Sequence, residues 1–300
     1  MSAGRAKRSP NRLVAAIFLA ASLAVLVAPT SADARAVAVG AGEDHSCALK
    51  ASGKVVCWGG NGAGQASPPP GEFRSLDTGW THNCGVQADD ELACWGYDGF
   101  GQASPPPGEF RSVSAGDDHS CGVRPGRKVR CWGHDPGADY GQADPPGGRF
   151  RSVSAGRSHT CGVRASGKAR CWGRDDAGQA SPPAGQFRSV SAGSFATCGV
   201  RPNDNVRCWG SGSEASPPAQ AFRSVDLGTF HACGVKLSRK ARCWGDEGEK
   251  VDYGQADPPG GRFRSVSAGA YHSCGVKASG KVRCWGRDDS GQSDVPPRLR

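Results

Sequence analysis

Fourteen cysteines carry the clearest chemical signal in this sequence of 300 residues. Thiols at a fixed spacing can form disulfides, bind a metal ion or remain free. Structural zinc sites usually contain two cysteines separated by two to four residues, and this sequence has no such spacing. We therefore predict seven disulfides and no metal site, with buried free thiols as the alternative. The two members of each pair stand ten positions apart, and Trp-Gly follows the second: Cys47 and Cys57, Cys84 and Cys94, Cys121 and Cys131, Cys161 and Cys171, Cys198 and Cys208, Cys233 and Cys243, and Cys274 and Cys284.

Histidine is the second residue type that could do chemistry. Six of the seven histidines recur two positions before the first cysteine of a pair: His45, His82, His119, His159, His231 and His272. A ring of imidazoles could bind a metal or respond to pH. One histidine per repeat, however, places neighbouring imidazoles too far apart to share an ion. We expect each histidine to hydrogen-bond the backbone and to hold the first turn of its repeat.

Catalytic motifs are absent from the sequence. It contains no Gly-x-Ser-x-Gly elbow, no phosphate-binding loop and no His-Glu-x-x-His. Serine, histidine and aspartate are frequent, but they occur as parts of the repeat. We predict that the protein is not an enzyme and that it has no catalytic residues and no cofactor.

The segment between paired cysteines has the pattern of a β-hairpin. Val276 and Val282 favour strands, and Ala278-Ser279-Gly280 favours a turn. A chain folded about Ser279 places Cys274 opposite Cys284, and cross-strand Cβ atoms lie about 4.5–5.5 Å apart, close to disulfide geometry. The turn residues vary between repeats while the cysteine spacing does not. This pattern predicts one disulfide within each hairpin.

The N-terminal segment has the pattern of a secretion signal peptide over residues 1–34. Four basic residues precede an apolar run from Leu13 to Ala28, and Ala32-Asp33-Ala34 resembles a signal-peptidase site. An uncleaved anchor is the alternative. Export would place the cysteines in an oxidising compartment, where structural disulfides persist. We therefore predict a secreted, periplasmic or cell-surface protein that has no membrane attachment after cleavage.

Residues 35–300 consist of repeats without spacers. The first cysteines of successive pairs are separated by 37, 37, 40, 37, 35 and 41 residues. Each unit contains a first strand ending in Ala-Gly, a two-residue turn, the hairpin, and a polar loop ending in Pro-Pro. A weaker fourth strand is expected through Gln-Ala-Ser. Four short strands at this period are typical of a propeller blade. We predict an all-β, seven-bladed β-propeller of 35–41-residue blades formed by 35–300 as a single domain, with a solenoid as the alternative.

The repeat resembles a known family. Ala-Gly-x-x-His-Ser/Thr-Cys-Gly-Val, followed by Gly-Lys-Val-x-Cys-Trp-Gly and Gly-Gln, is similar to the repeat of the regulator of chromosome condensation family. That resemblance implies a seven-bladed propeller. The export signal and the Pro-Pro ending look more like the secreted bacterial members, one of which inhibits β-lactamase. The cysteine pairs are an addition to the usual repeat. The nuclear exchange activity of the eukaryotic founder is not expected in an exported protein.

Side chains that break the repeat are the candidate binding residues. The tryptophans after the second cysteines and the Gly-Gln pairs recur, so we expect them to join blades. By contrast, the turns before the histidine position carry an aromatic residue in four repeats and aspartates in two others, including Asp117. Grouped aromatics on a rigid face indicate a binding surface. The predicted partner-binding residues are Trp80, Phe195, Phe230, Tyr271, Asp44 and Asp118, with the loops 134–140 and 246–253 as the alternative surface.

The sequence thus predicts a secreted, non-enzymatic protein-binding scaffold that acts as a monomer. Inhibition of an extracellular enzyme such as β-lactamase is the specific function that the resemblance implies. A carbohydrate-binding, lectin-like propeller is the alternative. Arginines also recur beside the cysteines, and the formal net charge is +9. Because acidic residues are interspersed with them, we interpret this charge as a solvated surface and not as a nucleic-acid site.

Overall fold

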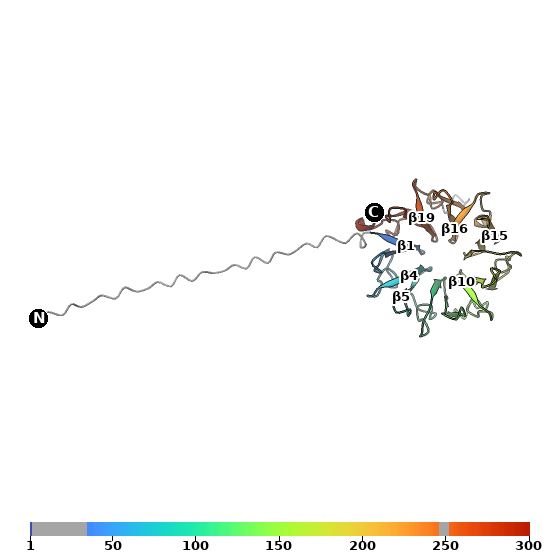
Figure 1. Ribbon diagram of the computed structural model, residues 1–300, viewed down its shortest axis with the longest axis horizontal. Helices are drawn as coiled ribbons and strands as arrows, with labels where there is room; N and C mark the ends of the chain where they lie inside the picture. The colour runs from blue at the N-terminus through green and yellow to red at the C-terminus, as the bar shows by residue number, and fades with distance from the viewer. Residues whose placement is uncertain (2–34, 246–251) are drawn as a thin grey trace.

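The computed structural model describes residues 1, 35–245 and 252–300. The predicted signal peptide, apart from Met1, and most of the 246–253 loop lie outside the described residues. The described chain forms seven three-stranded antiparallel sheets, which surround a central axis as blades (Figure 1). The prediction of a seven-bladed propeller is confirmed. Among the described residues, no helix is long and apolar enough to span a membrane.

Each blade is built from three consecutive strands. The first strands line the central channel: β1 (Ala36–Ala41), β4 (Phe73–Thr78), β7 (Ser112–Ala115), β10 (Phe150–Ala155), β13 (Ser189–Ala192), β16 (Phe222–Leu227) and β19 (Phe263–Ala268). The second strands are β2 (His45–Lys50), β5 (His82–Gln87), β8 (Ser120–Val123), β11 (His159–Arg164), β14 (Ala196–Val200), β17 (His231–Lys236) and β20 (His272–Lys277). The third strands are β3 (Val55–Gly59), β6 (Leu92–Gly96), β9 (Val129–Trp132), β12 (Ala169–Gly173), β15 (Val206–Gly210), β18 (Ala241–Gly245) and β21 (Val282–Gly286).

The predicted disulfides are confirmed in all seven blades. In blade 1, Cys47 lies opposite Cys57 in the ladder between β2 and β3, and the two sulfurs are bonded. No described cysteine is free. Each bridge closes a short loop, so restriction of the unfolded chain contributes about 2.5–3 kcal/mol apiece. In blades 2 to 7 the bonds join Cys84 to Cys94, Cys121 to Cys131, Cys161 to Cys171, Cys198 to Cys208, Cys233 to Cys243, and Cys274 to Cys284.

The predicted fourth strand is wrong. The Gln-Ala-Ser and Gln-Ala-Asp segments form turns, and each described sheet has three strands. The physical reason is that the carbonyl that would start a fourth ladder is already occupied. The Gln65 carbonyl, for example, accepts the indole N–H of Trp95 and the side-chain amide of Asn83. The following prolines have no N–H to continue a ladder.

The core lies between neighbouring blades. One face of blade 4 presents Cys161 and Val163, and these pack against Phe187 and Trp209 of blade 5. The same arrangement recurs around the ring, and the tryptophans pack between blades as predicted. Within a blade, Phe187 lies over Gly199, where a Cβ would be 2.3 Å from the phenyl ring. The repeated register of Phe and Gly therefore lets each ring lie flat on its own sheet.

Blade 1 is the exception, and it explains how the ring closes. Ala36 stands where the other blades have Phe, and Ala48 stands where they have Gly. The C-terminal segment fills the resulting space, because Val295 and Leu299 pack with Ala36 against blade 7. Leu299 belongs to the 3-10 turn η2 (Pro297–Leu299), and the C-terminus lies beside β1 (Figure 1).

Candidate functional site

The histidines join neighbouring blades through buried hydrogen bonds. His82 Nε2 lies 2.7 Å from Ser120 Oγ, and that hydroxyl donates to the Gln102 carbonyl at 3.0 Å. Because the hydroxyl donates to the carbonyl, it must accept from the imidazole, and the network assigns the Nε2–H tautomer. The imidazole therefore bonds the next blade and not the backbone of its own turn. The expectation that histidine holds its turn is met by its main chain, because the His82 carbonyl accepts the N–H of Gly79 at 2.9 Å.

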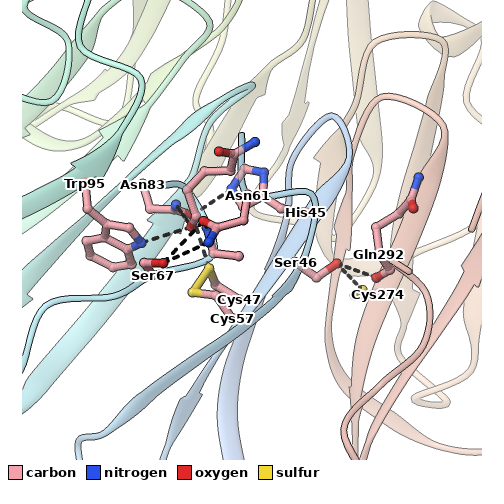
Figure 2. Close-up of a disulfide and its surroundings, with 12 residues drawn as sticks. His45, Ser46, Cys47, Cys57, Asn61, Ser67, Asn83, Trp95, Cys274 and Gln292 are labelled. Carbon is pink, nitrogen blue, oxygen red and sulfur yellow. Dashed lines mark hydrogen bonds between the residues drawn. A yellow bond between two sulfur atoms is a disulfide. The ribbon is translucent and has the colours of Figure 1, made fainter. Parts of the chain in front are cut away.

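The same junction appears around most of the ring, with Asn83 replacing the hydroxyl between blades 1 and 2. Figure 2 shows this contact beside the Cys47–Cys57 disulfide, and Ser46 bonding the Gln292 carbonyl on the other side. The Gly-Gln pairs therefore do join blades, through the glutamine carbonyls. Each glutamine side chain instead folds back on its own loop; Gln65 Oε1, for example, accepts from Ala63 N.

The junction between blades 5 and 6 lacks this network. Ala196 replaces the histidine and Ala232 replaces its hydroxyl partner. Leu227, which stands where most blades have alanine, packs with both in an apolar cluster. Glu214 replaces the glutamine in η1 (Ser213–Ala215) and is buried, and burial raises its pKa. The sequence shows this paired loss, because the fifth repeat has Ala196 at the histidine position and the sixth has Ala232 at the hydroxyl position.

The turns before the histidines meet around the axis. In six of the seven turns the N–H of the first turn residue donates to a carbonyl of the next blade, as in Trp80 N to Gly116 O at 3.1 Å. The bond from Ala270 N to Gly42 O, at 3.0 Å, closes the ring from blade 7 to blade 1. We call this surface the turn face; it comprises these turns and the loops that leave the third strands beside them.

Replacing Gly228 by alanine is expected to destabilise the ring by at least about 3 kcal/mol. A Cβ at this position would lie 2.0 Å from the Gly269 carbonyl oxygen, and a backbone atom held in the ring of turns cannot move away cheaply. Chemical denaturation measures the loss. Gly126→Ala is the matched control, because a Cβ there meets nothing within 4 Å. Equal stability of the two variants would contradict tight packing at the axis.

Each turn places its two residues differently. The first residue points at the channel mouth, which is lined by Glu43, Trp80, Asp117, Arg157, Ser194, Thr229 and Ala270. The second residue precedes the histidine further out, where Asp44, Asp118, Phe195, Phe230 and Tyr271 stand. Trp80 is thus not equivalent to the other three aromatics. The four aromatic side chains are all half-buried, whereas a binding surface predicted from the sequence would expose them.

Arg157 connects the residues of the channel mouth. Its guanidinium lies 5.8 Å from the ring centroids of both Trp80 and Phe195, and its Nε lies 3.8 Å from Asp117 Oδ2. Burial raises the pKa of Asp117 to about 8, and the neighbouring charge of Asp118 adds to this effect. The Trp80 indole donates to the Glu43 carboxylate, whose pKa burial also raises. Two predicted aromatics, Trp80 and Phe195, are therefore brought together here by Arg157, a residue that is not among the predicted partner-binding residues.

The other two predicted aromatics form a second cluster. Phe230 and Tyr271 have ring centroids 5.2 Å apart, and Tyr253 packs edge-on against Tyr271 at 5.9 Å. Arg287 lies 5.5 Å from the Tyr271 centroid and 5.6 Å from that of Tyr253. In the alternative loop 134–140, Tyr140 stacks with Arg174 at 5.4 Å in the same manner.

Charge is unevenly distributed between the two faces of the molecule, although acidic and basic residues are interspersed along the sequence. Three arginines oppose the described carboxyl groups of the turn face, and each of them already has an acidic neighbour: Arg157 lies beside Asp117, Arg174 beside Asp176 and Arg287 beside Asp289. The turn face therefore has an excess of acidic groups, although burial raises the pKa of Asp117 to about 8 and also raises the pKa of Glu43 and of Asp118. Its exposed or half-exposed carboxylates are Glu43, Asp44, Asp98, Asp117, Asp118, Asp135, Asp139, Asp175, Asp176, Asp252, Asp288 and Asp289.

A polar channel of about 230 Å³ continues from the mouth along the axis. Serine and aspartate side chains of the first strands accept N–H groups of the next blade, as in Ala115 N to Asp77 Oδ2 at 2.9 Å and Ala155 N to Ser114 Oγ at 3.0 Å. Desolvation raises the pKa of Asp77 to about 7. These bonds make the channel part of the scaffold. The described residues contain no group of three metal-ligating side chains.

Comparison with known proteins places this geometry in context. The family model of the regulator of chromosome condensation (RCC1) repeat matches residues 36–65, 110–142, 150–179, 187–214 and 263–292. No curated protein sequence matches the chain. Among solved structures, Prp20p of Saccharomyces cerevisiae is 13% identical over 88% of this chain and 85% of its own, with a TM-score of 0.69, and is similar in fold alone.

Two plant receptor-kinase ectodomains are more similar in sequence. The ectodomain of Physcomitrella patens CR4 is 27% identical over 83% of this chain and 72% of its own, with a TM-score of 0.70. The CRINKLY WD40 ectodomain of Arabidopsis thaliana ACR4 is 31% identical over 87% of this chain and 97% of its own, with a TM-score of 0.71. The repeat matches and the ACR4 alignment together show that this chain belongs to the regulator of chromosome condensation (RCC1) repeat family.

Proposed function

We propose that this protein is a secreted, non-enzymatic scaffold that binds a protein partner through the turn face. The observation that carries the proposal is where the repeat is broken. Blade-joining residues recur, whereas the turn positions vary and gather Trp80 with Phe195, and Phe230 with Tyr271. Aromatic rings held by packing lose little conformational entropy when they dock, so they are efficient anchors.

Electrostatics support a basic partner. Acidic groups lie beside both aromatic clusters, Glu43 and Asp117 at the first and Asp289 at the second, and they would attract and orient a positively charged surface. Seven disulfides are typical of a protein from an oxidising compartment, which is consistent with export. The similarity to two receptor ectodomains supports the same location. A β-lactamase is the first candidate partner, on the resemblance to secreted bacterial inhibitors; a polysaccharide is the second class of ligand.

The test is the pair of variants Trp80→Ala and Phe230→Ala in a pull-down from culture medium and in a β-lactamase inhibition assay. Each change is expected to weaken binding of a protein partner by at least about 2 kcal/mol while thermal stability changes little. Leu237→Ala is the control, because Leu237 is an apolar, exposed side chain that lies in a hairpin turn at the other end of its blade.

Two results would contradict the proposal. Retention of a polysaccharide and of no protein would favour the lectin-like alternative. Loss of stability with unchanged affinity would show that the aromatics are packing residues, and the binding surface would then be sought at the 134–140 and 246–253 loops.

A further inference from the structure

The ends of the hairpins form a second face that is basic. The turns between second and third strands lie opposite the turn face in every blade, since each second strand runs away from its histidine. The position after the hairpin turn is lysine in five of seven blades, and all five lysines are exposed. Among the described residues none of them is in an ion pair. They are Lys54, Lys128, Lys168, Lys240 and Lys281.

Arginines on this face are ordered without being neutralised. Arg124 stacks on Phe110 at 4.8 Å and donates to the Pro107 carbonyl at 2.9 Å, and Arg264 donates to the Ala278 carbonyl at 2.6 Å. A carbonyl holds a guanidinium in place but leaves its charge uncompensated. Ion pairs on this face are confined, among described residues, to Arg74 with Asp90 and Arg188 with Asp204.

Exposed apolar side chains separate by type between the two faces. Tyr97, Tyr140 and Tyr253 are exposed on the turn face. Leu237 is 44% exposed in a hairpin turn, and Val37 is 46% exposed at the start of β1, next to the hairpin of blade 7. Aliphatic side chains among lysines and arginines are typical of surfaces that rest on a lipid interface.

We propose that the hairpin face, defined by the seven hairpin turns and the adjoining starts of the first strands, docks on an anionic lipid bilayer. The lysines are spread around a rigid ring and not along a groove, so a planar array of phosphates can contact several at once, whereas a rod-like polyanion would meet few. Each lysine near an anionic surface contributes about 1 kcal/mol. The bilayer repels the acidic turn face, so docking presents that face to the medium.

This inference departs from the expectation that the exported protein has no membrane contact, and it is independent of the protein partner. The attachment is peripheral, because it relies on charge and two aliphatic side chains. Docking also accounts for the separation of charge, since the basic hairpin face would contact the bilayer while the acidic turn face stays free to bind a partner. Blade 2 interrupts the basic ring with Asp89 and Glu91, and blade 5 has Asn205.

The experiment is co-sedimentation of the full chain with vesicles of phosphatidylcholine alone or of phosphatidylcholine and phosphatidylglycerol in equal parts. Anionic vesicles are expected to bind the chain at low salt and to release it as salt rises. The variant K128Q/K168Q/K281Q is expected to bind on the order of 100-fold less tightly, from three lysines at about 1 kcal/mol each. The control R157Q/R174Q/R287Q removes the same charge from the turn face and is expected to bind as the parent chain does.

Three outcomes would overturn the proposal. The first is no preference for anionic vesicles. The second is equal loss in the two triple variants, which would mean that only net charge matters. The third is tighter binding to duplex DNA than to vesicles at the same salt, which would assign the face to a polyanion. The apolar N-terminal segment is identical in all three chains, so it cannot produce a difference between them.

Discussion

Lowering the pH from 7 to 4 is expected to unfold the propeller in one cooperative transition. Burial lowers the pKa of His82, His119 and His272 to about 3 and that of His159 and His231 to about 4, and it also lowers the pKa of His45. In the unfolded chain a histidine titrates near 6.5. The stabilising contribution of each neutral histidine is therefore complete above pH 6.5, and it falls by up to about 1.4 kcal/mol per pH unit towards the folded pKa.

Several carboxyl groups act in the opposite direction. Burial raises the pKa of Asp77 to about 7 and that of Asp117 to about 8, so their ionisation destabilises the fold at higher pH and protonation relieves it. The Asp77 carboxyl group lines the channel and that of Asp117 lines its mouth, whereas the six histidine side chains are fully buried. We therefore expect the histidines to dominate below about pH 6.

Tryptophan fluorescence and circular dichroism, recorded across the pH range, measure the transition. The sharper readout is the slope of unfolding free energy against pH, which reports protons taken up on unfolding. His119→Gln should reduce that slope by close to one proton, because burial lowers the pKa of His119 to about 3. Constant stability from pH 7 to pH 4 would show that the buried imidazoles accept protons in the folded state.

The propeller could be predicted because its local signals agree. The cysteine spacing predicts the hairpin register, and Ala-Gly and Trp-Gly predict the strand ends. The period predicts the size of a blade, and the seven cysteine pairs predict seven blades. Agreement between local pattern and global fold is typical of sequences with a single native structure. The fourth strand could not be predicted well, because the fate of a carbonyl depends on the neighbouring blade. The Gln65 carbonyl is used by Trp95 and Asn83, and neither lies in its own blade.

The candidate site was predicted less completely for a related reason. The sequence shows which turns break the repeat but not which side chains meet across the axis. Arg157 is three repeats from blade 1 and follows an ordinary Ala-Gly, yet it connects Trp80 with Phe195. Segregation of charge was equally hidden, because acidic and basic residues alternate along the chain while they separate by face once each hairpin folds back. The position of a charged residue within its repeat, and not the local density of charge in the sequence, determines which face of the propeller it reaches.

Removing residues 287–300 is expected to open the ring and to abolish cooperative folding. This segment supplies the Gln292 carbonyl, which accepts from Ser46 Oγ and from the Trp58 indole, each at 2.9 Å. It also supplies Val295 and Leu299, which fill the space that phenylalanine occupies in the other blades. Without it, blade 7 and blade 1 would present an apolar face to water. Leu299→Ala alone should cost about 2–5 kcal/mol, the range for a buried leucine, whereas exposed Leu237→Ala should cost little.

A rescue distinguishes lost packing from a general need for the C-terminus. In a chain ending at Asp294, which keeps Gln292, the double change Ala36→Phe and Ala48→Gly gives blade 1 the residues of the other six. Phenylalanine then fills the vacated space, and glycine gives its ring the room that Gly199 gives Phe187. Calorimetry is expected to show that the double variant recovers most of the stability lost on truncation. Ala36→Phe with Ala48 retained should recover less, because the Cβ at position 48 would clash with the ring. If neither variant gains stability over the truncated parent, ring closure does not depend on filling that space.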